Sequence, residues 1–100
     1  MGDKKLGDSK TVIKKVVLDV LKPLEPSIVD MATEIASVEG IENVNITSIE
    51  IDRNTESVKI SVEGNDVNIE KIKVVIEKLG GVIHSVDEVT SSKKRKQTLV

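Results

Sequence analysis

Residues 55–81, TESVKISVEGNDVNIEKIKVVIEKLGG, contain a strand, a turn and a helix in direct succession. Apolar and polar side chains alternate over residues 58–63, which is the period of a strand with one buried face. Residues 64–66 predict a turn, and either the last of them or Asn68 can cap the following helix. Gly80-Gly81 predicts the end of that helix. Its apolar side is formed by Ile69, Ile72, Val75, Ile76 and Leu79.

The first half of the chain repeats this pairing of a strand with a helix. Residues 12–21 predict a strand, and residues 22–26 predict its end because their two prolines lack a backbone donor. A helix should then begin at residue 26 or 27 and run to about Val38, where Gly40 stops it. The strand's period-2 set is wholly apolar and should face the core: Val16, Leu18 and Val20.

Two further strands complete the pattern. The apolar phase changes within residues 43–52, which predicts a strand with a bulge near Thr47-Ser48. A polar hairpin loop should follow at residues 52–56, and residues 82–89 predict the last strand. The order βαββαβ predicts an α+β, ferredoxin-like fold, in which a four-stranded antiparallel sheet has both helices on one face. The first strand should be central and pair with the third and fourth, leaving the second and fourth as edges.

The chain has the length of one domain, which we place at residues 12–90. Residues 1–11 should be a flexible segment and residues 91–100 a disordered basic tail, because neither carries a periodic apolar face. The chain has no aromatic residue and no cysteine, so its core must be aliphatic. The lack of cysteine fits a cytoplasmic protein, and no apolar run approaches the roughly 20 residues of a membrane helix.

Charge is segregated along the chain although the net charge is only −2. Residues 1–15 carry five lysines against two aspartates, and residues 91–100 carry four basic residues and no acidic one. Residues 16–90 carry fifteen acidic residues against six basic ones. A folded body this acidic repels phosphate, which argues against a nucleic-acid partner.

Several segments together resemble a known family. VLDVLKP (17–23) with EPSIV (25–29), and LGGVIHSVDEV (79–89), are the most specific of them, and short matches lie at 50–52 and 55–60 between them. In these segments the chain is similar to an archaeal family called domain of unknown function 211, over about residues 12–90. The resemblance implies a ferredoxin-like fold, ring-like homo-oligomers and an archaeal, intracellular origin. It implies no activity.

His84 is the single histidine and falls in the last predicted strand. If Val86 pairs with Val17 in an antiparallel ladder, Asp19 lies opposite His84. A carboxylate beside an imidazole could bind a ligand or share a metal ion. A structural cross-strand pair is the alternative, and a slip of one residue would move His84 to the other face.

Asp52, Asn54 and Glu56 offer oxygen ligands to a hard divalent cation such as Ca²⁺ or Mg²⁺. Their spacing matches only a fragment of a calcium loop, so a solvated turn is the alternative. No other cofactor is indicated. Without cysteine or tyrosine, and with no serine in a nucleophile-elbow setting, the sequence does not indicate an enzyme.

We therefore expect a non-enzymatic module that assembles with itself into a closed homo-oligomer larger than a dimer. A regulatory small-ligand site at the subunit contacts would fit such a module by analogy of fold. The contact should involve the helix-free face of the sheet, where Val17, Leu21 and Val86 are expected among polar residues. A cation-binding protein that uses its acidic surface is the second hypothesis, and an enzyme of unknown class is the third.

Overall fold

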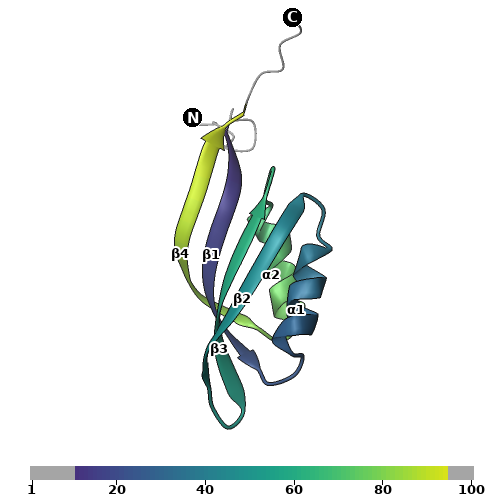
Figure 1. The fold of residues 1–100 in the computed structure, drawn as a ribbon, viewed down its shortest axis with the longest axis vertical. Helices are drawn as coiled ribbons and strands as arrows, with labels where there is room; N and C mark the ends of the chain where they lie inside the picture. Colours follow the sequence, from purple (N-terminus) through teal and green to yellow (C-terminus); the bar gives the residue numbers. More distant parts are fainter. Residues whose placement is uncertain (1–10, 95–100) are drawn as a thin grey trace, which may run out of the picture.

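A computed structural model describes residues 11–94 and has the predicted order of elements (Figure 1). The elements are β1 (Thr11–Pro23), α1 (Ile28–Ala36), β2 (Ile41–Ile51), β3 (Thr55–Gly64), α2 (Ile69–Lys78) and β4 (Val82–Lys93). The strands form one antiparallel sheet in the order β2-β3-β1-β4. The ferredoxin-like α+β fold is thus confirmed, with β1 in the centre and β2 and β4 at the edges. No helix within residues 11–94 is long and apolar enough to cross a membrane.

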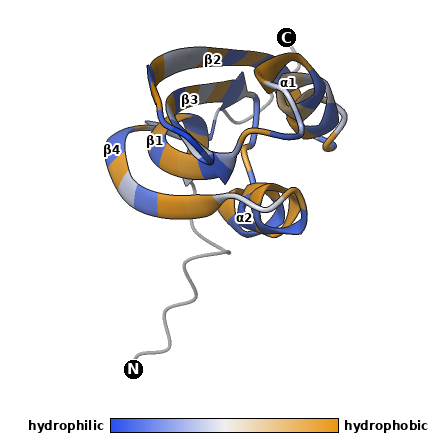
Figure 2. Cartoon of the chain, turned by 90° about the horizontal axis from the view of Figure 1, so that it is seen from below, coloured by the Kyte–Doolittle hydropathy of each residue, from blue (hydrophilic) through white to orange (hydrophobic). Residues whose placement is uncertain are grey.

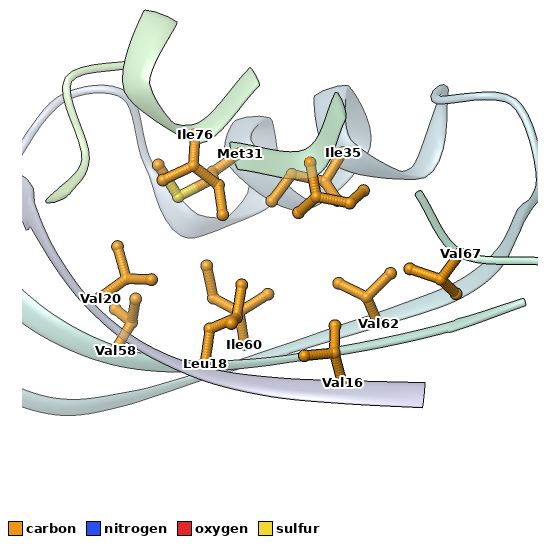
Figure 3. Packing of buried hydrophobic residues seen from close by; sticks show 11 residues of the cluster. Val16, Leu18, Val20, Met31, Ile35, Val58, Ile60, Val62, Val67 and Ile76 are labelled. Carbon is orange, nitrogen blue, oxygen red and sulfur yellow. The ribbon is translucent and has the colours of Figure 1, made fainter. Parts of the chain in front are cut away.

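Both helices lie on the same side of a curved sheet, and the core fills the space between the helices and the sheet (Figure 2). The alternating residues of β1 and β3 point toward the helices in Figure 3, as their period predicted. Met31 and Ile35 of α1, and Ile72 and Ile76 of α2, meet them from the other side. The inward strand residues are at most 1% exposed: Val16, Leu18, Val20, Val58, Ile60 and Val62. The core is therefore wholly aliphatic apart from the Met31 thioether.

Local signals at the helix ends also agree with the sequence. The Ser27 hydroxyl accepts a hydrogen bond from the Asp30 amide, and the Asn68 side chain accepts one from the Lys71 amide. Each side chain satisfies an amide that the first helical turn would leave unpaired. Gly40 and Gly80 follow the two helices with φ of 91° and 90°, a conformation in which glycine avoids the strain of a side chain.

The pair formed by β1 and β4 is longer than predicted and extends beyond the helices in Figure 1. Thr11 pairs with Lys93 and Ile13 with Ser91. Residues 91–93 therefore belong to the sheet and not to a disordered tail, because pairing with the start of β1 satisfies their backbone groups. The remaining predictions of flexible ends, at residues 1–10 and 95–100, lie outside the described residues.

Five residues have no partner across the strand ladders. They are Lys14 in β1, Glu42 and Ile49 in β2, and His84 and Asp87 in β4. The irregularity at Ile49 is next to the bulge predicted at Thr47-Ser48. Those in β4 were not predicted, and they change which face its side chains occupy.

A buried lysine borders the core at the C-terminal end of β1. Lys22 continues the inward series of β1 and is 0% exposed, and it pairs directly with Glu56 of β3. Its Nζ donates to Oε1 of Glu56 at 3.2 Å and to the carbonyls of Pro23 at 2.7 Å and Leu24 at 3.3 Å. An ammonium group has three N–H donors, and these three acceptors satisfy all of them without water.

The Lys22–Glu56 pair should be strongly coupled in stability. Lys22→Met should lower the free energy of unfolding by about 3 kcal/mol, because it leaves a mostly buried carboxylate without its cation. Lys22→Met/Glu56→Leu should recover most of that loss. Urea unfolding followed by circular dichroism measures both. Equal losses in the two variants would assign the stability to the carbonyl bonds of Pro23 and Leu24 instead.

The Lys22–Glu56 pair should also make the free energy of unfolding depend on pH in the acidic range. Hydrogen bonds from the Ser48 hydroxyl and then Lys22, with the charge of Lys22, hold the pKa of Glu56 below its ordinary value of 4.5, against an opposing effect of burial. A lowered folded-state pKa contributes stability above the unfolded value, and this is lost as pH falls through the folded one. Glu56→Gln should therefore be less stable than the parent at pH 7, and the difference should shrink below pH 4.5. A difference that is constant with pH would contradict this.

Candidate functional site

The register of β4 differs from the one that would pair Asp19 with His84. Asp19 lies opposite Ser85, and Val20 lies opposite Ile83, so His84 is the extra residue between them. The predicted direct pairing is therefore wrong. The cause is the bulge, which a simple alternating ladder does not include.

Asp19 and His84 nevertheless line the same hollow, on the side of the sheet that the helices leave bare. The hollow has a volume of about 290 Å³, and Val20, Leu21 and Ser57 complete its wall. Within residues 11–94, the side chains of Asp19, Ser57 and His84 form no hydrogen bond or ion pair. A carboxylate, a hydroxyl and an imidazole thus face a shared space with free bonding capacity.

Ser57 was not singled out in the sequence. The signal that could have found it is its place in β3, where it lies opposite Leu21 and alternates with inward Glu56 and Val58. Residues opposite one another share a face of the sheet, so Ser57 lies on the bare face with Leu21. It is two residues from Lys59, which lies opposite Asp19 on the same face.

The three residues of the predicted cation site do not lie together at the β2–β3 hairpin. Asp52 and Asn54 are exposed, whereas the carboxylate of Glu56 turns inward to Lys22. Alternation along β3 sends Glu56 toward the helices and away from the loop. Over the part of the chain that the structure describes, no three His, Cys, Asp or Glu residues are grouped as metal ligands.

The predicted apolar patch is divided as well. Val17 and Leu21 lie on the bare face, but Val86 pairs with Leu18 and so lies on the helix side. The prediction that placed Val86 with the other two is wrong, because the extra residue His84 shifts the following residues of β4 by one position.

The bare face is otherwise polar and held by ion pairs. Lys59 bonds Asp87 at 2.7 Å, and Lys15 bonds Glu88 at 3.4 Å. Asp87 reaches this face as the extra residue of β4, and it also accepts a hydrogen bond from Ser85 at 2.7 Å. A surface with this composition can face water without a partner.

The helix side of β4 has the opposite character. Val86 and Val89 are 52% and 49% exposed although they pair with inward Leu18 and Val16 and so lie on the side that the core occupies. Helix α2 covers β4 much less than α1 covers β2. A groove of about 420 Å³ lies between α2 and β4, with apolar Leu18, Ile69 and Ile83 along its floor. This edge of the sheet therefore presents an uncovered apolar strip, to which Val86 and Val89 belong.

The other edge, β2, is suited to strand pairing in its middle. Residues 43–48 have no extra residue and no charged side chain. Edge strands usually carry charges, prolines or bulges that block pairing with another chain. In β2 the irregular residues, Glu42 and Ile49, lie outside this segment.

The Lys59–Asp87 pair provides a test of the β4 register. Lys59 lowers the pKa of Asp87 mainly through its hydrogen bond, and Ser85 adds to the effect. Lys59→Met should therefore raise the pKa of Asp87 toward its ordinary value of 3.8, and Lys71→Met on α2 should leave it unchanged. Carboxyl NMR titration measures this. An Asp87 pKa insensitive to Lys59 would place Asp87 elsewhere than the bare face.

Comparisons with known proteins agree with the sequence resemblance. Residues 14–97 match the family domain of unknown function 211, which is described as uncharacterized ArCR. Uncharacterized protein MJ0319 of Methanocaldococcus jannaschii is 52% identical over 82 residues, which cover 82% of this chain and 84% of that protein. The family match includes all six elements of the fold except the start of β1. The chain therefore belongs to the archaeal family domain of unknown function 211.

Proposed function

We propose that this protein is a non-enzymatic module that assembles with itself head to tail, with β4 of one copy beside β2 of the next. The observation that carries the proposal is the uncovered strip of Val86 and Val89 on the helix side of an edge strand. Covering these half-exposed valines would contribute about 1 kcal/mol each.

Strand directions are compatible with this contact. β1 is antiparallel to β3 and β4, and β3 is antiparallel to β2, so β2 runs opposite to β4. A second copy in the same orientation would therefore offer its β2 to β4 as an antiparallel partner. Its helices would lie on the same side of the joined sheet, with α1 next to the exposed valines, because α1 packs over β2.

A contact of this kind uses two different surfaces of the chain. It closes into a ring when the rotation between copies allows, and otherwise grows into a filament. A two-fold contact of β4 with β4 would instead stop at a dimer. We expect a ring larger than a dimer, since the uncharged segment 43–48 gives β4 a complementary edge.

The hollow of Asp19, Ser57 and His84 supports a ligand site next to this contact. His84 lies on β4, so a neighbouring copy at that edge would border the hollow. The chemistry offered is a carboxylate, a hydroxyl and an imidazole, which suits a small polar ligand.

Sedimentation of two complementary variants tests the assembly. Val86→Lys should block β4 by placing a charge in the apolar strip. Asn45→Glu/Thr47→Glu should block β2, because its new charges would lie on the bare face of the joined sheet, which also carries Asp87 and Glu88 of the neighbour. Each variant alone should sediment as a monomer at tens of micromolar, and an equal mixture should form a heterodimer through the one intact contact.

The matched control is Val74→Lys, since Val74 on α2 is 54% exposed against 52% for Val86. It should sediment like the parent. A dimer that persists in Asn45→Glu/Thr47→Glu would indicate a two-fold β4 contact. Dissociation by Leu21→Lys alone would assign the contact to the bare face, and a monomeric parent would refute assembly altogether.

A further inference from the structure

We propose that a hollow at the open end of the β1–β4 pair binds a small, multiply charged phosphate anion. The hollow has a volume of about 460 Å³. This is within the range of small-ligand pockets. It is lined by Val12, Lys14, Asn65, Asp66, Ser92, Lys93 and Lys94.

The fold gathers these residues from three distant parts of the chain. The ladder that pairs Thr11 with Lys93 brings the start of β1 beside the end of β4. The turn between β3 and α2 joins them, because the Val67 amide donates to the Ile13 carbonyl at 2.8 Å. Lys14 is the extra residue of β1 and lines the hollow with Lys93 and Lys94.

The lysines of the hollow are not neutralised by the protein. Within the described residues Lys14, Lys93 and Lys94 form no ion pair, whereas Lys15 next to them in sequence bonds Glu88. Asp66 is the single acidic residue in the lining, so three positive charges face one negative charge. An anion in the hollow would relieve the repulsion between the ammonium groups.

The charge distribution of the sequence gives independent support. Lys10 directly precedes the described residues, and Arg95 and Lys96 directly follow them. Lys14, Lys93 and Lys94 of the hollow belong in sequence to these two basic stretches, while residues 16–90 carry the acidic excess.

Phosphate groups are the part of a ligand that this site can recognise. Three ammonium groups and the Ser92 hydroxyl can donate hydrogen bonds to phosphate oxygens. The Asn65 amide already donates to a Glu42 carboxylate oxygen at 2.7 Å, and its second N–H can donate as well. The chain has no aromatic side chain on which a nucleobase could stack. A long nucleic acid would also extend over the acidic surface beyond the hollow, which favours a small anion.

Isothermal titration calorimetry of the full chain tests the site with four probes: tripolyphosphate, ATP, adenosine and a single-stranded oligonucleotide. Tripolyphosphate and ATP should bind with similar affinity that falls with added salt, and adenosine should not bind. Lys14→Gln/Lys94→Gln should weaken tripolyphosphate binding at least about tenfold, or about 1.4 kcal/mol. Amide NMR shifts on titration should centre on Asn65 and Ser92.

The matched control is Lys73→Gln/Lys78→Gln, which removes the same charge from the exposed side of α2 and should leave the affinity unchanged. Equal weakening by the two double variants would reduce the effect to net charge and overturn the proposal. Absence of tripolyphosphate binding would also overturn it. Oligonucleotide binding much tighter than tripolyphosphate binding would identify a nucleic-acid surface instead.

Discussion

The pairing of β4 with β1 is the constraint on which the functional surfaces of this molecule depend. β1 lies in the centre of the sheet, and its partner β4 carries two residues more than a regular ladder would need. One extra residue reverses the faces of all that follow it. The two in β4 therefore decide that Val86 faces the helix side, that Asp87 reaches Lys59, and that His84 borders a hollow with Asp19.

The fold itself could be predicted because its signals are local and periodic. The alternation of Val58, Ile60 and Val62, the helical spacing after Asn68 and the glycine at position 80 each specify one element. They agree with one another, which is the condition for a unique fold. The charge of Lys22 hid its inward position, although the alternation of β1 continues through it to Glu56 across the ladder.

For the candidate site, the sequence predicted two of the residues but not how they are arranged. Asp19 and His84 were chosen for their chemistry, and the structure brings both to one hollow, but by a different register and together with Ser57. A bulge changes neither composition nor hydrophobicity, and β4 alternates poorly around residues 84–88, so nothing in the chain indicates which residue is the extra one. Glu56 failed as a cation ligand for a clearer reason, since a carboxylate opposite an inward lysine is held by that lysine.

The direct pairing of Thr11 with Lys93 has a topological consequence. Residues that are 82 positions apart in the chain are neighbours in the sheet, so the described backbone is close to a closed loop. When the two ends of a chain are neighbours, the fold depends on the order of the elements around the loop more than on the element at which the chain begins. A chain that begins at the exposed β2–β3 hairpin, with Thr11 and Lys93 joined by a short connection, should form the same sheet.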